Sequence, residues 1–169
     1  ISVTAHAQVL TVREQAKLVD QLLGERLNNV LPVLMERTGI DMWVIMSREY
    51  NEDPVLKTML PAEWLSARRR TILVFYNNTQ KKVYEKLAIA RYDVGEHIKA
   101  AWDMQKFPNQ WDALADLIRT RAPKNIAVNT STDFGHADGL DQTDYYEFMQ
   151  KLPVPYRTKV VSAESLAVA

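Results

Sequence analysis

The chain has 169 residues, of which 47% are apolar and 25% charged, a mixture typical of one globular domain with a single core. Its 21 Lys and Arg residues balance its 21 Asp and Glu residues, so net charge gives no reason to expect nucleic acid or an anionic membrane as a partner. Cysteine is absent, which excludes disulfides, thiol nucleophiles and Cys-ligated metal centres.

The N-terminus carries one motif of the kind that directs export. Ala5, His6 and Ala7 fit the small-x-small pattern that precedes a signal-peptidase cut, but no basic or apolar leader stands before them. If this tripeptide is a cleavage site, the protein is exported to the periplasm or secreted; otherwise it is cytoplasmic. We expect residues 1–11 to be a flexible N-terminal segment and residues 12–169 a single domain.

The first predicted elements are a long helix and a buried strand. Leucine and valine recur at three- and four-residue steps over residues 12–38, which predicts a helix with one apolar face. Pro32 predicts a kink within it, and Gly39 a left-handed end. Residues 40–47 are apolar almost throughout and lack a helical period, which favours a buried strand.

A polar connection over residues 48–70 follows, and a short helix is expected either between Pro54 and Pro61 or over residues 61–69. Later residues alternate between strand and helix patterns. We expect strands at 71–78, 82–93, 125–129 and 156–163, helices at 109–123 and 143–152, a loop at 131–142, and the first turns of a helix at 164–169. The run 95–104 fits a loop or a weak helix.

This alternation, with one antiparallel hairpin formed by residues 71–78 and 82–93, predicts the fold class. An α/β domain is expected, with a mixed β-sheet flanked by helices on both faces. Within the helix at 143–152, Asp144 and Glu147 have the spacing of a capping box.

The loop DFGHADGLD contains the best metal-ligating candidates of the chain. Asp133, His136, Asp138 and Asp141 are oxygen and imidazole donors that can hold a divalent cation. The same residues are also common turn formers and helix caps, and that simpler interpretation stands beside the metal site. No H-E-x-x-H pair, G-x-S-x-G elbow or glycine-rich phosphate loop occurs.

A segment rich in arginine precedes the second predicted strand. Arg68, Arg69 and Arg70 precede the strand at 71–78, where guanidinium groups suit a carboxylate or another anion. The alternative is a solvated helix end. Trp64 lies in the same connection, and we expect it at an exposed contact site, whereas Trp43 and Trp111 lie in regular elements and are expected in the core.

The order of these pieces resembles the N-terminal domain of the creatinase, prolidase and Xaa-Pro aminopeptidase family. The resemblance covers about residue 13 to the end. It begins with a helix ending ERTGID, the strand MWVIMS and a polar segment before the strand TILVFY. A helix, the strand NIAVN, the FGHADGL loop, another helix and the segment VVSAESLA follow later in the chain. It is carried by order and spacing rather than by an invariant motif.

The resemblance implies a ribonuclease H-like domain that is not catalytic. The family's metal ligands belong to a C-terminal "pita-bread" domain with two divalent ions per site, which is absent from this chain. The resemblance therefore implies a fragment that is inactive alone, and a whole protein that is a metal-dependent Xaa-Pro peptidase. It further implies two partners, the protein's own catalytic domain and a second protomer in a homodimer; neither nucleic acid nor membrane is expected.

Arg48 and Tyr50 are expected at the substrate cleft or dimer contact because they stand at the polar end of the first strand. The resemblance implies the same role for the connection before the second strand, which contributes Trp64, Arg68, Arg69 and Arg70. No catalytic residue and no metal ligand is assigned. Two other interpretations remain open. One is a free-standing α/β interaction or oligomerisation module. The other is a small enzyme that uses the Asp133, His136 and Asp138 loop.

Overall fold

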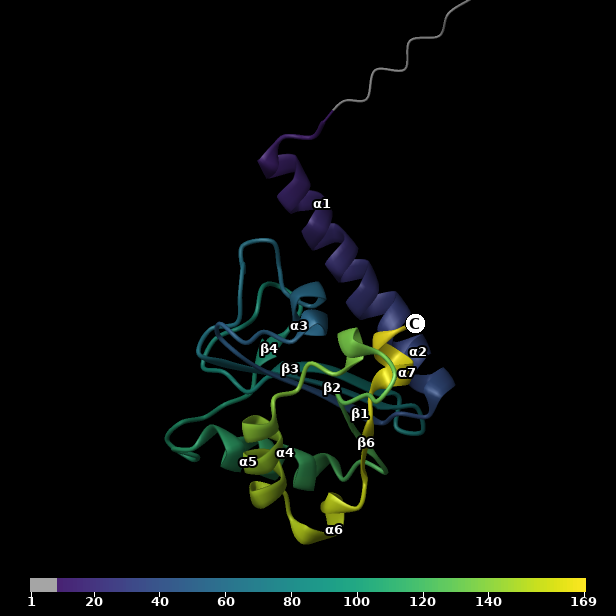
Figure 1. The fold of residues 1–169 in the computed structure, drawn as a ribbon, viewed down its shortest axis with the longest axis vertical. Helices are drawn as coiled ribbons and strands as arrows, with labels where there is room; N and C mark the ends of the chain where they lie inside the picture. Colours follow the sequence, from purple (N-terminus) through teal and green to yellow (C-terminus); the bar gives the residue numbers. More distant parts are fainter. Residues whose placement is uncertain (1–8) are drawn as a thin grey trace, which may run out of the picture.

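A computed structural model describes residues 9–169, and a six-stranded sheet forms its middle layer (Figure 1). The spatial order of the strands is β4-β3-β2-β1-β5-β6. Their bounds are β1 Met42–Arg48, β2 Arg70–Asn78, β3 Val83–Ala88, β4 Lys99–Ala100, β5 Ile126–Val128 and β6 Val160–Ser162. Strand β2 is antiparallel to β1 and β3, whereas β1, β5 and β6 run parallel. The predicted α/β class with a mixed sheet is confirmed.

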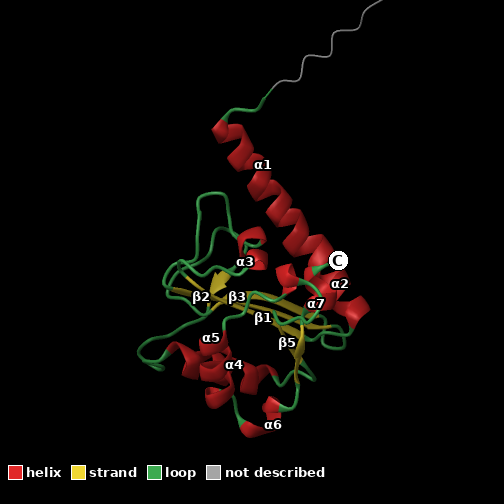
Figure 2. Ribbon diagram, viewed as in Figure 1, coloured by secondary structure: helices red, strands yellow, loops and turns green. Residues whose placement is uncertain are grey.

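Helices cover both faces of this sheet (Figure 2). One side carries α1 Val12–Glu25, α2 Leu31–Thr38, α3 Pro54–Thr58 and α7 Glu164–Ala167, and the other carries α4 Gln110–Arg121, α5 Gln142–Lys151 and α6 Val154–Arg157. Side chains alternate between the two faces along each strand, so the central strands feed two apolar cores. Trp43, Ile45 and Phe75 belong to one core, and Val44 and Met46 to the other.

The long N-terminal helix begins at a capping box and ends as predicted. Thr11 and Glu14 bond each other's backbone N–H groups, which satisfies two free donors of the first turn. Between α1 and α2 lies a five-residue π turn, Arg26–Val30, so the irregularity stands just before Pro32, which occupies the first turn of α2. Gly39 closes α2 with φ 68°, the left-handed conformation that glycine adopts without strain.

Much of α1 stands away from the body of the domain (Figure 1). Within this helix only Leu23 and Gly24 are buried. Val12, Leu18, Val19 and Leu22 are exposed, so an apolar arc of the helix meets solvent. An isolated helix of this length is marginal in water. The exposed arc is therefore a surface available for contact.

Two sequence predictions need correction, and one that left two positions open is decided. Residues 95–104 contain neither a helix nor a plain loop, because Lys99 and Ala100 form the short strand β4 beside β3. The strand expected at 156–163 is confined to β6, because its first two residues belong to the one-turn helix α6, which has Pro155 in its first turn. Of the two positions offered for the short helix, the structure has the one between Pro54 and Pro61, which is α3.

Candidate functional site

The predicted site residues gather where β1 ends and β2 begins. These two strands are central in the sheet, and we call the side of the sheet formed by their ends the edge. The antiparallel register places Arg48 directly opposite Arg70. Two loops project from this edge, residues 49–53 after β1 and residues 61–69 before β2, and we call them the edge loops. They are tied together, since the Glu49 N–H donates to the Arg69 carbonyl at 2.7 Å and the Glu49 carboxylate accepts from the Arg69 N–H at 3.2 Å.

Arg48 and Arg70 both turn toward α5. Arg48 forms a bidentate pair with Asp141, with distances of 3.0 Å from Nε and 2.9 Å from Nη2. Arg70 bonds Asp144 at 2.9 Å and Glu147 at 3.0 Å. Because these carboxylates lie three residues apart, they share one face of α5. The two arginines therefore hold α5 against the sheet edge. The contact role expected for them at a cleft or dimer interface stays a prediction.

The capping box predicted at Asp144 is wrong. Asp141 is the N-cap of α5, where its side chain accepts from the N–H groups of Thr143 and Asp144. Asp144 is fully buried instead, with Oδ1 bonded to Arg70 and Oδ2 without any hydrogen-bond partner. Burial raises the pKa of Asp144, since removal from water disfavours the charged carboxylate more than Arg70 favours it.

Trp64 is buried rather than exposed, contrary to its prediction. Its ring packs 6.0 Å from the ring of Tyr92, and the Arg68 guanidinium lies 4.1 Å from the Trp64 centroid and 5.8 Å from that of Tyr92. A guanidinium held on aromatic faces loses little freedom when it binds an anion, because its plane is already fixed. Trp64 is thus the support for Arg68. Trp43 and Trp111 are buried as predicted.

The tips of the edge loops are exposed and conformationally strained. The side chains of Tyr50 and Leu65 are 93% and 89% exposed. Tyr50 and Arg69 have φ values of 68° and 53°, in the left-handed region that favours glycine. Each such residue costs about 1 kcal/mol of backbone energy. Two strained residues on two joined loops are typical of a surface that is shaped for contact.

A hollow of about 470 Å³ lies between the second edge loop and the segment after β3. We call it the arginine groove, and its principal lining residues are Arg68, Arg69, Arg70, Arg91, Tyr92 and Trp102. None of its lining residues is acidic. Arg91 and Tyr92 were not among the sequence candidates, because the segment that carries them was expected to be the end of a hairpin strand. Their proximity to Arg68 depends on β4 returning beside β3.

The loop proposed as a metal site is not organised around an ion. Asp141 is engaged by Arg48, and Asp138 accepts from the Ser131 N–H. Asp133 and His136 are exposed. Within residues 9–169 no group of three or more His, Cys, Asp or Glu side chains has an arrangement that could hold a metal ion.

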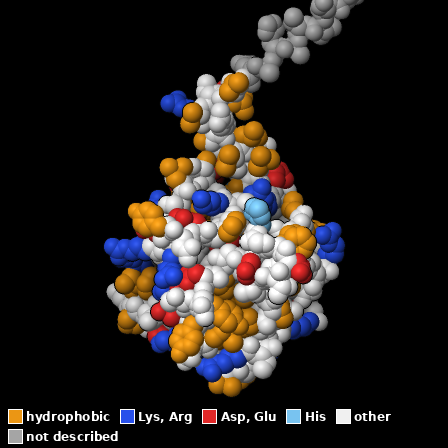
Figure 3. Space-filling view, viewed as in Figure 1, with side chains coloured by type: hydrophobic (Ala, Val, Ile, Leu, Met, Phe, Trp, Pro, Cys, Tyr) orange, Lys and Arg blue, Asp and Glu red, His pale blue; other side chains and the backbone are white. Residues whose placement is uncertain are grey.

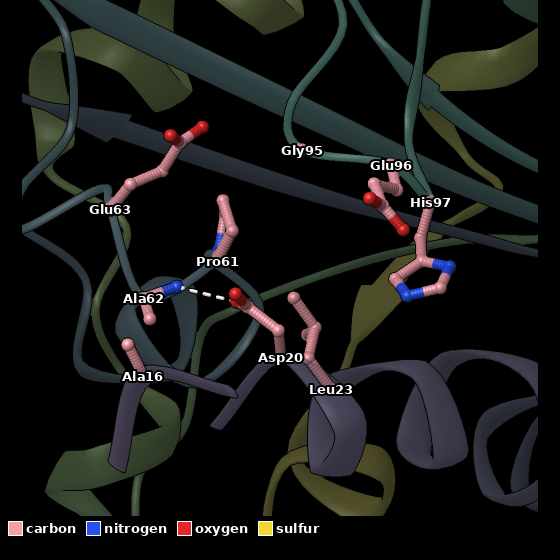
Figure 4. A pocket seen from close by; sticks show the side chains of 9 residues that line it. All are labelled: Ala16, Asp20, Leu23, Pro61, Ala62, Glu63, Gly95, Glu96 and His97. Atoms are coloured by element: carbon pink, nitrogen blue, oxygen red, sulfur yellow. Dashed lines mark hydrogen bonds between the residues drawn. The ribbon is translucent and has the colours of Figure 1, made fainter. Parts of the chain in front are cut away.

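Another cavity, of about 340 Å³, lies between α1 and two loops (Figure 4). The Asp20 carboxylate accepts from the Ala62 N–H at 2.8 Å and so fixes the loop to the helix. The ring of His97 lies close enough to Gly24 that a Cβ there would stand 2.9 Å from Nε2. These contacts attach α1 to the domain, which is a structural role.

No helix in the described part of the chain is both long and apolar enough to span a bilayer. The tripeptide Ala5-His6-Ala7 lies outside the described residues.

Neither a family model nor a curated protein matches this chain. Among solved structures, part of a Xaa-Pro dipeptidase from Bacillus anthracis is similar in structure, with a TM-score of 0.41 and 13% sequence identity. The similarity covers 87% of this chain and 34% of the dipeptidase chain, so this chain spans about a third of that protein.

Proposed function

We propose that this chain is the non-catalytic N-terminal domain of a Xaa-Pro peptidase, and that its edge loops line the substrate cleft or the dimer contact. The observation that carries the proposal is the pair of joined, strained loops that expose Tyr50 and Leu65. A strained backbone and a large exposed apolar side chain both lower the stability of an isolated domain, and contact with another surface compensates for them.

The order of elements supports the family assignment. A helix ends at Gly39, a buried strand follows, and the edge loops lead into an antiparallel hairpin. The chain then passes through α4, β5, the loop before α5, and β6. This is the succession on which the sequence resemblance is based. In this proposal the two divalent ions and all catalytic groups belong to a separate catalytic domain, and this domain supplies surface and shape.

The proposal separates two kinds of residue at the edge. Arg48 and Arg70 position α5 through their ion pairs, so substituting them would disturb the fold as well as any contact. Tyr50, Leu65 and Arg69 project from the loops and make few internal contacts. Their substitution leaves the ion pairs to α5 in place, so it tests the proposed contact more directly than substitution of Arg48 or Arg70.

The test uses the product of the complete reading frame that encodes this chain, assayed with Xaa-Pro dipeptides and Mn²⁺. The double variant Tyr50→Ala, Leu65→Ala is expected to raise KM about tenfold, equivalent to about 1.4 kcal/mol of lost binding, or to shift the dimer toward monomer. The matched control is Tyr145→Ala, Val154→Ala, which removes an exposed tyrosine and an exposed aliphatic residue elsewhere. Unchanged KM and unchanged mass in the edge variant would overturn the proposal.

A free-standing interaction module is the second candidate, and the exposed apolar arc of α1 favours it. In that case the 169-residue chain associates by itself. Light scattering after size exclusion would show concentration-dependent association that Leu18→Glu, Leu22→Glu abolishes. A chain that stays monomeric at all concentrations removes the oligomerisation form of this alternative.

A further inference from the structure

The arginine groove adjoins a second hollow of about 530 Å³, and the two share Arg70, Trp102 and Gln110 as lining residues. The second hollow has aromatic and apolar lining residues, Trp102, Pro108, Trp111 and Tyr146, together with polar and charged ones. Among the latter are Lys151 and Glu147, and Glu147 is already paired with Arg70. We call the two together the double groove. Each part alone is within the size range of small-molecule sites. One part is cationic, and we call the other the aromatic part after Trp102, Trp111 and Tyr146.

The cationic part has more charge than a single carboxylate can use. Arg70 is already paired with Asp144 and Glu147. Arg68, Arg69 and Arg91 have no ion pair with any residue in the range 9–169. One guanidinium satisfies one carboxylate in a bidentate pair. Three unpaired guanidinium groups around one hollow therefore favour an anion with several charges.

The aromatic part is arranged for stacking. Trp102 stands between the two hollows, with its indole N–H donating to the Phe107 carbonyl at 2.8 Å, so its orientation is fixed while its ring is partly exposed. Tyr146 is 64% exposed beside it. Figure 3 shows Lys and Arg side chains next to apolar ones, with Asp and Glu side chains among them, on the left of the face in view. A flat ring joined to a polyanion would engage both parts at once.

We propose that the double groove binds a small polyanion that carries an aromatic ring, the chemistry of a nucleoside di- or triphosphate. Arg68, Arg69 and Arg91 contact the phosphates, and Arg68 is preorganised for this by Trp64 and Tyr92. Trp102 and Tyr146 contact the base. Binding needs no glycine-rich loop, because side-chain guanidinium groups take the place of backbone N–H groups. The inference goes beyond the proposed function, since it requires no catalytic domain.

The experiment is calorimetric titration of the 169-residue chain at low ionic strength with ATP, inorganic triphosphate, adenosine and N-acetylproline. We expect ATP to bind about tenfold more tightly than triphosphate, because the base adds stacking. Adenosine and N-acetylproline are expected to bind far more weakly than either polyanion. Added salt should weaken ATP binding, because the contacts are exposed and ionic.

Variants assign the binding to the two parts. Arg68→Ala and Arg91→Ala should each weaken ATP and triphosphate by about tenfold, and the control Arg37→Ala, an exposed arginine on α2, should leave both unchanged. Trp102→Leu should remove the preference for ATP over triphosphate. Tyr146→Ala, at an exposed position, should reduce that preference without affecting the fold.

Three outcomes would overturn the proposal. The first is no binding of ATP or triphosphate at millimolar concentration. The second is binding that survives loss of Arg68 and Arg91. The third is tighter binding of N-acetylproline than of triphosphate, which would make the groove a reader of single carboxylates. None of these outcomes bears on Xaa-Pro hydrolysis by the complete reading-frame product, so the two proposals fail separately.

Discussion

Gly139 lies directly against the buried carboxylate of Asp53, and a Cβ at Gly139 would stand 2.4 Å from the carboxylate carbon. Asp53 cannot move aside freely. Its oxygens accept from the Val55 and Leu56 N–H groups, where it caps α3, and from the Asn129 side chain at 2.8 Å. The contact joins the loop before α5 to the first edge loop, so it fixes the position of the candidate site.

Gly139→Ala is therefore expected to lower the free energy of unfolding by about 2 kcal/mol, because a methyl group is forced into a filled polar contact. Urea denaturation measures the loss. Gly135→Ala is the matched control in the same loop, since nothing lies within 4 Å of its added Cβ. Equal stability of the two variants would contradict the packing described here.

Asn129 connects two buried polar groups. Its Oδ1 accepts from the Trp43 indole at 2.7 Å, and its Nδ2 donates to Asp53. Asn129→Ala leaves both partners buried and unsatisfied, so we expect a loss of about 3 kcal/mol in denaturant unfolding. Asn29→Ala, which removes only an exposed bond to Glu25, should change stability by less than about 0.5 kcal/mol. A small loss in the Asn129 variant would mean that these groups find other partners.

The raised pKa of Asp144 gives a pH prediction with a definite sign. A carboxyl whose pKa is higher in the folded than in the unfolded state binds its proton more tightly when folded. Its stabilising contribution is then full below the ordinary Asp range and is lost as pH rises through the folded pKa. The charged groups facing it are Arg70, Arg48 and Asp141.

Wild type should therefore lose stability relative to Asp144→Asn as pH rises from acid to neutral. Asp53, whose pKa burial also raises, is present in both proteins and cancels in the comparison. Urea unfolding of both proteins across this range measures the difference. A difference that grows in favour of wild type toward neutral pH would mean that the Arg70 ion pair outweighs burial.

At the strained loop residues, we expect substitutions that relieve the strain to raise stability and to weaken the proposed contact. Tyr50→Gly and Arg69→Gly should each raise the free energy of unfolding by about 0.5 kcal/mol, because relief of the left-handed strain exceeds the added freedom of the unfolded chain. Lys82→Gly, with φ 52° in the turn between β2 and β3, should show the same gain. Tyr50→Gly should also weaken substrate or dimer contact, whereas Lys82→Gly should not. Weakened contact in both variants would contradict the assignment.

Patterns within single elements predicted the fold well. The apolar runs at β1 and β2, the glycine after α2 and the face of α4 are local features, so sequence alone indicated the helices, the hairpin and the core tryptophans. The site depends on pairing across the sheet. Arg48 and Arg70 meet α5 only because β1 and β2 share a register and α5 returns over their edge.

The side chains that sequence reasoning misjudged each have a distant partner. Trp64 is buried because Tyr92 and Arg68 cover it, and Asp144 is buried because Arg70 reaches it across 74 residues of chain. Arg91 and Trp102 join the groove through a two-residue strand too short to leave a pattern.

We propose that this domain shapes a peptidase without performing its chemistry. The most direct measurement is hydrolysis of Xaa-Pro dipeptides with Mn²⁺, Co²⁺ or Zn²⁺, comparing the 169-residue chain with the product of its complete reading frame. We predict turnover by the complete product and none by the chain alone. Metal-dependent turnover by the isolated chain, or no turnover by the complete product, would contradict the claim.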